Sequence, residues 1–491
     1  MTRLPLAVIS LVFFASALAQ APPPPALDGI WLGTLHTGGP SLRLQFHLHQ
    51  DAGKWNCSLD SLDQNALAIP CTVVSATNPI TIDVPAVHGK WSGGLTANTL
   101  DGTWTQGALL PITFERQTSI AKPRPVPPPD AALPPADANS MKSILDKDLA
   151  AALSSGALAP STHVGVTIGV VTRGQRNIFS YGIAKPDSVF EIGSISKTFT
   201  GLILAQMVEQ KSVQLSEPVR ELLPSGTVTK PASGAEITLL DLSDQHSGLP
   251  RLPDNFSPAN PANPYADYDT KHLYAYIAKH GVALPSNAPF GYSNLGVGLL
   301  GAALANRANL SYNDLLHQQI TGPLHMDDTA VVLTPSMRAR FIEGHDSTHH
   351  SAQAWDLDAL AGAGGIRSTA ADMLTYLEAQ LHPDKLSAVS TPQGKTLPAA
   401  INASHTIHAE VSPGVHIALN WFHNDAAGSF WHNGATGGYS AYTLFNSDKD
   451  FALIVLLNIS IGEDNFADRL GQHIAQRLAG QPAISLAPAP Q

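Results

Sequence analysis

The chain has 491 residues, a formal net charge of −11 at pH 7 and only 14% charged residues. Such a length suggests two or three domains and is ample for a sizeable hydrophobic core. Because the sequence contains no basic cluster of the kind that nucleic-acid binding requires, we expect no nucleic-acid partner.

Residues 1–19 have the composition of a secretory signal peptide. Arg3 precedes an apolar stretch, and Ala17-Leu18-Ala19 provides the small residues of a cleavage site. A transmembrane anchor is the alternative, but the stretch is short and contains Pro5. We expect cleavage after Ala19, no membrane span after that cleavage, and a mature protein that is periplasmic or secreted.

The chain contains two cysteines, Cys57 and Cys71. In an exported protein such a pair predicts a disulfide, which for a loop of about 15 residues contributes roughly 3 kcal/mol to the free energy of unfolding. Two buried free thiols are the alternative. Neither reading leaves a cysteine for catalysis in the rest of the chain.

Residues 28–116 show the alternation of apolar and polar residues that is typical of strands, with glycine and asparagine at the turns. We expect a small antiparallel barrel or sandwich. Four of the seven tryptophans fall here, and we expect them in its core, with a carbohydrate-binding face as the alternative. Residues 117–137 include seven prolines and predict a semi-rigid linker.

Residues 138–480 carry the remaining patterns, and residues 481–491 are expected to form a tail. A helical pattern at 138–155 precedes two predicted strands at 163–171 and 177–182. The residues between those strands, Arg173-Gly174, predict a tight turn. This part of the chain therefore mixes helices with antiparallel strands.

Ser194 and Lys197 lie three residues apart at the start of a helical pattern that runs to about Lys211. A helix start stabilises an oxygen that gains negative charge, and position i+3 lies on the same helix face. A lysine held neutral by burial can activate a serine nucleophile. A second Ser-x-x-Lys, at Ser119, runs into Pro123 and predicts no helix.

Two further motifs follow in the chain. Tyr292-Ser293-Asn294 lies on a predicted loop before a helical run at 295–304. Taken alone, its tyrosine would as readily pack in a core and its asparagine cap the helix. His432-Asn433-Gly434 precedes two strand-like runs, at 440–446 and 451–457.

These motifs resemble those of a known family. Phe190 to Lys197 is similar to the active-site signature of class C β-lactamases and related penicillin-recognising serine hydrolases, and the Tyr-x-Asn and His-x-Gly motifs follow in that family's order. The third signature is more often Lys-Thr-Gly, so His432 is a departure. His246 to Arg251 and Leu360 to Thr369 look most like AmpH-type D-alanyl-D-alanine carboxypeptidase/endopeptidases, which act on peptidoglycan peptides.

The resemblance implies an α/β (α+β) β-lactamase/transpeptidase-like sandwich, with an antiparallel sheet and a helical subdomain, after the small all-β domain. It implies that Ser194 is the nucleophile and that Lys197 and Tyr292 remove its proton and deliver one to the leaving group. Further implied roles concern substrate binding: Asn294 orients Lys197 and binds the substrate amide, His432 meets the substrate carboxylate or Tyr292, Gly434 lets the strand approach the substrate, and the backbone of Ala435 completes an oxyanion hole with that of Ser194.

The implied function is that of an exported serine acyl hydrolase that cleaves D-Ala-D-Ala-type peptides or β-lactam amides through an acyl-enzyme. Its partner is a small-molecule or peptide substrate, and no cofactor or metal is required. A histidine is largely neutral at pH 7, so carboxylate-bearing β-lactams are expected to bind less strongly than with a lysine at position 432. The alternatives are a carboxylesterase on the same scaffold and a penicillin-binding sensor or wall-binding protein with little turnover.

Overall fold

The computed structural model describes residues 27–36, 41–64, 66–87, 89–106, 109–123, 127–137, 139–388, 392–462 and 465–487. The expected signal peptide and its cleavage site lie outside these residues. Within the described ranges, no helix has both the length and the apolar character needed to cross a membrane.

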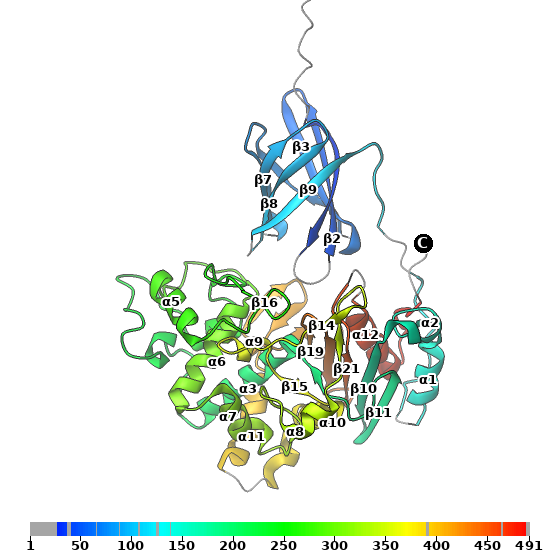
Figure 1. Ribbon diagram of the computed structural model, residues 1–491, viewed down its shortest axis with the longest axis vertical. Coiled ribbons are helices and arrows are strands. Elements are labelled where there is room, and N and C mark those ends of the chain that lie inside the picture. Colours follow the sequence, from blue (N-terminus) through cyan, green and yellow to red (C-terminus); the bar gives the residue numbers. More distant parts are fainter. Residues whose placement is uncertain are drawn as a thin grey trace, which may run out of the picture.

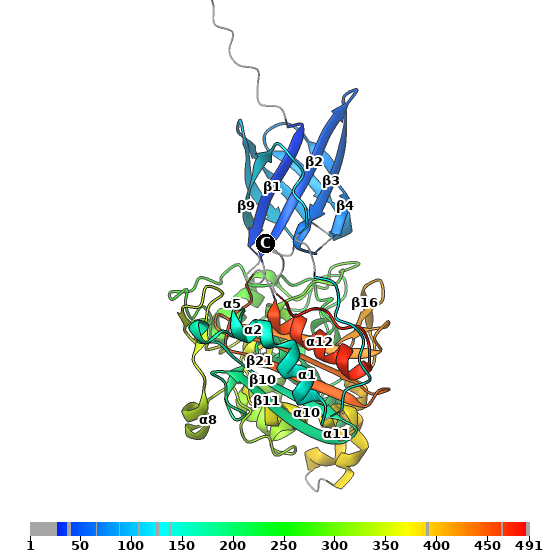
Figure 2. The same cartoon turned by 90° about the vertical axis from the view of Figure 1, so that its right-hand side faces the viewer.

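The N-terminal part of the chain, from residue 27 to 117, is a nine-stranded antiparallel sheet that curls into a barrel (Figures 1 and 2). The strand order is β4-β3-β2-β1-β9-β8-β7-β6-β5. The strands are β1 Gly29–His36, β2 Ser41–Asp51, β3 Lys54–Ser61, β4 Ala66–Pro70, β5 Thr72–Ser75, β6 Ile80–Val84, β7 Gly89–Leu95, β8 Thr99–Thr105 and β9 Leu109–Gln117.

Aromatic side chains fill this barrel. Trp31, Trp91 and Trp104 are at most 1% exposed, so the expectation that tryptophans form the core is confirmed for these three and a carbohydrate-binding face is wrong for them. The expected disulfide between Cys57 and Cys71 is also confirmed, with the two Cα atoms 5.0 Å apart. It ties β3 to the chain between β4 and β5, where the two ends of the sheet meet.

The proline-rich segment is attached to the protein at both of its ends. Near its start, the buried side-chain amide of Gln45 in β2 accepts a hydrogen bond from Ala121 N at 2.7 Å and donates one to Ala121 O at 3.4 Å. Near its end, Asp130 pairs with Ala483 through two backbone hydrogen bonds of 2.7 and 3.1 Å. These contacts fix the segment against the barrel at one end and against the rest of the chain at the other.

The C-terminal part, from residue 139 to 487, is built around an eight-stranded antiparallel sheet of order β11-β10-β21-β20-β19-β18-β17-β16. Arg173 and Gly174 both have positive φ, which is the tight turn expected between β10 and β11. The strands are β10 Gly165–Thr172, β11 Gln175–Gly182, β16 Ala409–Ser412, β17 Val415–Ile417, β18 Phe422–Asn424, β19 Ser429–Ala435, β20 Ser440–Asn446 and β21 Phe451–Leu457.

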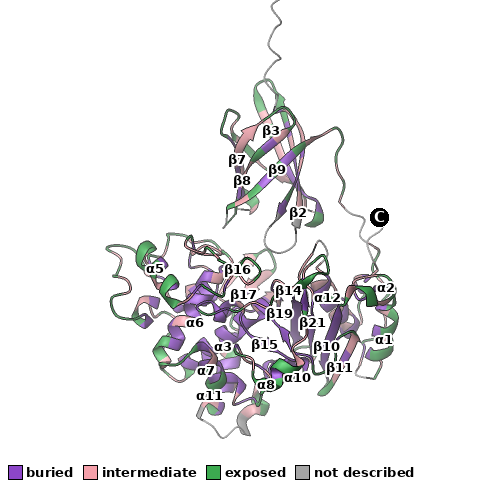
Figure 3. Cartoon of the chain, in the orientation of Figure 1, coloured by how far each residue is buried: buried purple, intermediate pink, exposed green. Residues whose placement is uncertain are grey.

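Helices cover both faces of this sheet, and its central strands are buried (Figure 3). Every residue of β21 is buried; Ile454 and Leu456 belong to one hydrophobic cluster, and Leu453 and Val455 to the other. The first cluster includes residues of α3 Ser196–Glu209, α10 Ala370–Leu381 and α11 Pro392–Ser404. The second includes residues of α1 Met141–Asp148, α2 Ala150–Ser154 and α12 Phe466–Ala479.

Beside the sheet, the described residues form six more α-helices. They are α4 Leu239–Ser243, α5 Thr270–His280, α6 Asn294–Ala308, α7 Tyr312–Leu316, α8 Pro335–Arg340 and α9 Ala361–Gly364. Among them, α5, α6 and α7 form the helical subdomain at the left of Figure 1. Thr238 caps α4 through a reciprocal pair of hydrogen bonds with Asp241. The expected fold class, a sheet sandwich with a helical subdomain after a small all-β region, is confirmed.

Candidate active site

Ser194 lies in a single 3₁₀ turn, Gly193–Ile195, directly before α3. The preceding residues, β12 Phe190–Glu191, pair with β15 Arg367–Ser368, and Ile192 N donates to Ile366 O at 3.1 Å. The chain is fastened again after Ser194, because the Ser196 hydroxyl accepts a hydrogen bond from Ile366 N at 3.1 Å. Ser194 is therefore held half-exposed at the N-terminal end of α3, as the sequence predicted.

Lys197, in the first turn of α3, is completely buried. Its Nζ atom lies 3.0 Å from Ser194 Oγ, 2.8 Å from Asn294 Oδ1 and 2.6 Å from Ala363 O. Burial, together with the nearby positive charge of Arg251, holds the pKa of Lys197 well below its ordinary value.

A neutral Lys197 amine suits its three neighbours. It has two N–H groups and one lone pair, and the oxygens of Asn294 and Ala363 are obligate acceptors in this pairing. Once both N–H groups are used, the lone pair remains for Ser194. The geometry therefore lets the Ser194 hydroxyl donate its proton to Lys197.

The Tyr292-Ser293-Asn294 motif lies on the loop that enters α6. Ser293, and not Asn294, caps that helix, because its hydroxyl accepts a hydrogen bond from Gly296 N at 2.8 Å. Asn294 is left free to bind Lys197, and the buried Tyr265 lies close to it. The capping role that a lone Tyr-x-Asn motif would suggest for the asparagine is therefore wrong here.

The Tyr292 hydroxyl is protonated in the folded protein at neutral pH. Burial raises its pKa to about 12, against the opposing effects of a hydrogen bond to Ser194 and of the Arg251 charge. Its ring lies 4.8 Å from Lys197 Nζ and 5.3 Å from Arg251 Cζ, both measured to the ring centroid. Tyr292 is thus a proton donor within reach of Ser194.

His432, on β19, is 1% exposed and neutral. Burial, with a smaller contribution from Lys197, lowers its pKa to about 3. Its Nδ1 lies 2.6 Å from the carbonyl oxygen of Asn433, and because a carbonyl can only accept, Nδ1 carries the proton. Its Nε2 is then an acceptor, and the ring lies 6.4 Å from that of Tyr292 between centroids.

The end of β19 lies directly on the Ser194 turn. A Cβ added to Gly434 would lie 2.0 Å from Ile192 O and 3.1 Å from Ser194 N. A Cβ added to Gly193, which has a φ of +52°, would lie 2.5 Å from Ala435 N. The two glycines therefore allow β19 to lie directly against the Ser194 turn, with Ser194 and Ala435 on the two sides of this contact.

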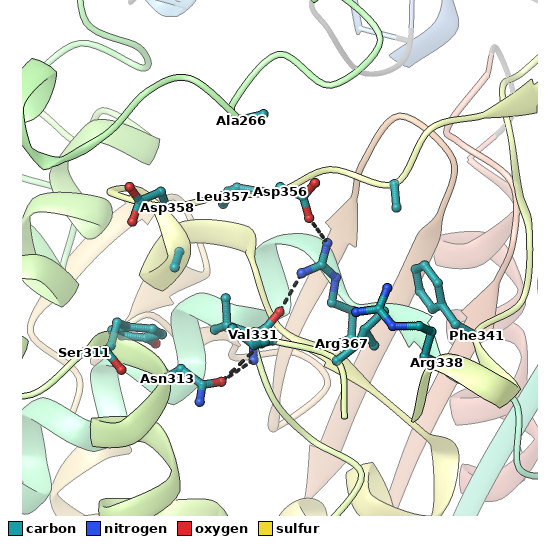
Figure 4. A pocket seen from close by; sticks show the side chains of 15 residues that line it. Ala266, Ser311, Asn313, Val331, Arg338, Phe341, Asp356, Leu357, Asp358 and Arg367 are labelled. Atoms are coloured by element: carbon teal, nitrogen blue, oxygen red, sulfur yellow. Dashed lines mark hydrogen bonds and ion pairs between the residues drawn. The ribbon is translucent and has the colours of Figure 1, made fainter. Parts of the chain in front are cut away.

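A buried ion pair between Arg367 and Glu191 lies next to the Ser194 turn. Arg367 Nη2 lies 3.3 Å from Glu191 Oε1 and 3.1 Å from Asp356 Oδ1, and its Nη1 donates to Val331 O at 2.5 Å. Figure 4 shows Arg367, Asp356 and Val331 on the wall of a cavity of about 520 Å³. This cavity is separate from the Ser194 group, none of whose residues line it.

Among the described residues, two groups offer three ligand atoms close enough for a metal ion, and neither contains a residue of the Ser194 group. In one, Arg477 already occupies the carboxylates of Asp130 and Asp148. The other consists of His416, His423 and Asp425 on the β17–β18 hairpin.

Three histidines close to Asp346 in the sequence, His345, His349 and His350, do not converge on a metal site among the described residues. His345 is 5% exposed and contacts Asn458, whereas the His350 side chain is 80% exposed. The described residues therefore give this cluster no shared ligand position.

The structure brings every predicted site residue into one group, namely Ser194, Lys197, Tyr292, Asn294, His432, Gly434 and Ala435. It adds three residues to which the sequence gave no role: Ala363, Tyr265 and Arg251. Ala363 contributes only its backbone oxygen, which no side-chain pattern reveals. Arg251 and Ala363 do lie within the two segments that resembled AmpH-type enzymes.

Comparison with known proteins gives a consistent picture. The model of the beta-lactamase family matches residues 151–477. The D-alanyl-D-alanine-carboxypeptidase/endopeptidase AmpH of Escherichia coli K12 is 31% identical over 232 residues, which cover 46% of this chain and 59% of AmpH. A beta-lactamase of Pseudomonas fluorescens is 27% identical over 265 residues, covering 52% of this chain and 68% of that protein. The chain thus spans less than two thirds of the length of AmpH.

Two solved structures share the fold. One is a class C beta-lactamase from Rhodobacter sphaeroides, with a TM-score of 0.53 and 22% identity, covering 70% of this chain and 96% of that one. The other is a beta-lactamase/D-alanine carboxypeptidase from Pseudomonas syringae, with a TM-score of 0.57 and 18% identity, covering 69% of this chain and 98% of that one. At these identities the likeness is one of fold.

Proposed function

Because this chain belongs to the beta-lactamase family and is a serine hydrolase, we propose that it is an exported enzyme that forms an acyl-enzyme at Ser194 and cleaves D-Ala-D-Ala-type peptides. One observation carries the assignment of the site: Nζ of the buried Lys197 lies 3.0 Å from Ser194 Oγ, 2.8 Å from Asn294 Oδ1 and 2.6 Å from Ala363 O. The similarity to AmpH supports the peptide substrate.

The proposed acylation step follows from this geometry. Lys197 takes the Ser194 proton as Oγ attacks the carbonyl carbon, and the backbone N–H groups of Ser194 and Ala435 bind the oxyanion. The bond to the leaving amine then breaks, and Tyr292 donates its proton to that nitrogen. Lys197 returns the first proton to Tyr292, so no net charge accumulates.

Deacylation repeats the same steps with water. Water attacks the ester carbon and loses a proton to the base, and the Ser194 oxygen regains a proton as the acid product leaves. His432 is assigned as a neutral hydrogen-bond acceptor toward Tyr292, because its Nδ1 proton is engaged with Asn433 O. Asn294 is assigned to hold Lys197 and to hydrogen-bond the substrate amide.

Export rests on the apolar leader of residues 1–19 and on the disulfide, a bond that persists in oxidising compartments. The substrate partner is a small molecule or a peptide. A carboxylesterase on the same scaffold is the second candidate, and the neutrality of the buried His432 favours it, because that histidine supplies no cation for a substrate carboxylate.

The test combines intact-mass analysis with product detection. The mature protein is incubated with benzylpenicillin and, separately, with an acetylated Lys-D-Ala-D-Ala peptide, and both adduct mass and released D-alanine are followed over time. We expect an adduct and D-alanine release from the wild type and from Ser154→Ala, an exposed-serine control, but neither from Ser194→Ala. D-alanine release by Ser194→Ala would refute the nucleophile. Ester hydrolysis without any D-alanine release by the wild type would favour the carboxylesterase.

A further inference from the structure

We propose that Arg251 is the carboxylate-binding residue of this site, so that the enzyme selects substrates whose leaving group carries a free α-carboxylate. The inference rests on the proposed function, because it takes Ser194 as the nucleophile and Tyr292 as the donor to the leaving group.

Arg251 is held beside the reacting groups by its backbone. Its carbonyl oxygen accepts hydrogen bonds from Asn294 N at 3.1 Å and from Leu295 N at 3.2 Å, so the loop that ends at Arg251 is fastened to the start of α6. Its guanidinium carbon lies 5.3 Å from the centroid of the Tyr292 ring, a cation–π contact. Tyr292 is therefore in contact with Lys197 and with Arg251.

Among the described residues, the charge of Arg251 has no acidic partner, and its guanidinium lies over the Tyr292 ring. Other arginines of this region are paired, as Arg220 is with Glu236, Arg307 with Glu217 and Arg367 with Glu191. A half-buried guanidinium without an acid is a costly arrangement that an incoming anion relieves.

The positive potential of Arg251 reaches the reaction centre. Its charge contributes to lowering the pKa of Lys197 and opposes the burial that raises the pKa values of Tyr292 and Tyr265. The His432-Asn433-Gly434 motif supplies no charge of its own, because His432 is neutral and its Nε2 carries a lone pair. Burial disfavours the charged form of Lys197 as well, whereas a guanidinium stays charged, so Arg251 is the permanent cation beside Ser194, Lys197, Tyr292 and His432.

The chemistry of an amino-acid leaving group matches this placement. Its amine nitrogen and its carboxylate are joined through a single Cα atom. When Tyr292 protonates that nitrogen, the carboxylate lies only a few bonds from it, and Arg251 contacts the ring of the same tyrosine. A guanidinium can bind a carboxylate through two parallel hydrogen bonds, which the amide of an internal peptide bond cannot accept in the same way.

The test compares two aryl esters of phenylacetylglycine, one with 3-hydroxybenzoate and one with the isosteric, neutral 3-hydroxybenzamide as leaving group. The measured quantity is the ratio of their kcat/KM values. Any effect of Arg251 on Lys197 is common to both esters and cancels in this ratio. We expect the wild type to prefer the carboxylate ester and Arg251→Gln to lower the ratio by about 10- to 100-fold.

Two further variants sharpen the result. Arg251→Lys should keep most of the preference, because it keeps the charge. Arg338→Gln, which removes an exposed arginine that also lacks an acid partner, should keep all of it. Equal rates for the two esters in the wild type, or an unchanged ratio in Arg251→Gln, would overturn the proposal.

The esters require only the serine chemistry, so this experiment is independent of the peptide substrate. An Arg251-dependent ratio without D-alanine release from the peptide would refute the D,D-peptidase function and leave the carboxylate site standing. D-alanine release together with a ratio that does not depend on Arg251 would support the D,D-peptidase function and refute the carboxylate site.

Discussion

The side-chain oxygen of Asn294 accepts a hydrogen bond from Lys197 Nζ at 2.8 Å. Lys197 Nζ makes a second hydrogen bond to Ala363 O. In the neutral amine these two bonds use both N–H groups, and the lone pair is left for Ser194. The protonation state of Lys197 therefore depends on Asn294 being uncharged.

Asn294→Asp should shift the acid limb of the pH–rate profile to higher pH. A carboxylate beside Lys197 favours the charged amine, and an opposite charge at this distance shifts a pKa by about 1 to 3 pH units. The midpoint of the acid limb of kcat/KM for a neutral ester should move to higher pH by that amount. Activity at pH 7 should then fall at least ~10-fold. Asn260→Asp, on the exposed part of the same subdomain, is the control. A profile that Asn294→Asp leaves in place would contradict a neutral Lys197.

Tyr292→Phe should affect substrates according to their leaving group. The Tyr292 pKa, raised to about 12, makes its hydroxyl a proton donor at neutral pH. An amine must be protonated to leave, so hydrolysis of an anilide should slow by ~10²–10⁴-fold, whereas a nitrophenyl ester should slow much less. Steady-state rates on the two substrates, with the partly buried Tyr274→Phe as the control, measure this difference. Equal losses on both would assign Tyr292 to some other step.

Gly434→Ala should damage both stability and activity. The new Cβ would lie 2.0 Å from Ile192 O, which is backbone and cannot move aside cheaply. We expect a loss of about 1–3 kcal/mol in the free energy of unfolding, as for other overpacked sites. Acylation should also slow, because β19 would be displaced from the Ser194 turn. Gly291→Ala, whose Cβ would meet nothing closer than Pro289 O at 3.9 Å, is the matched control in urea unfolding.

Asp468→Asn should make the protein relatively more stable as the pH rises. Burial raises the pKa of Asp468 to about 7 from an unfolded value of 3.8, and Asn433 donates to its Oδ2 at 2.7 Å. A raised pKa means that the folded state binds the proton more tightly than the unfolded state does. Its contribution is therefore full below about pH 4 and is lost as the pH rises through 7.

The asparagine variant lacks this titration. Its free energy of unfolding relative to the wild type should increase by up to about 4 kcal/mol between pH 4 and pH 8. Thermal melts of both proteins across this range give the comparison. Parallel curves would mean that Asp468 titrates alike in the folded and unfolded states.

Much of this fold follows from local sequence patterns. The strands β20 and β21 coincide with the predicted runs, and the turn at Arg173-Gly174 was marked by its glycine. The helix after Ser194 was clear because its apolar residues are periodic. Helices α10 and α11 were not predicted, because their apolar residues serve a core that forms only when distant segments meet.

The site was predictable where side chains carry the chemistry in a short motif, as for Ser194 with Lys197. It was not predictable where tertiary contact alone creates the role. Ala363 contributes a carbonyl oxygen, and its position depends on α9 packing against α3. Arg251 gains its position from a loop that hydrogen-bonds to Asn294. Ser293 took the capping role that the sequence offered to Asn294, because α6 begins at Asn294 and Ser293 directly precedes it.

The bridge between Asp130 and Ala483 places the proline-rich segment that enters the C-terminal part beside the end of that part. A part of a chain whose two ends lie close together can be excised, or inserted into another protein, without disturbing its folded core. Joining residue 483 to residue 130 by a short loop and opening the chain at the Arg173-Gly174 turn should therefore yield a folded circular permutant of the C-terminal part alone, without the barrel.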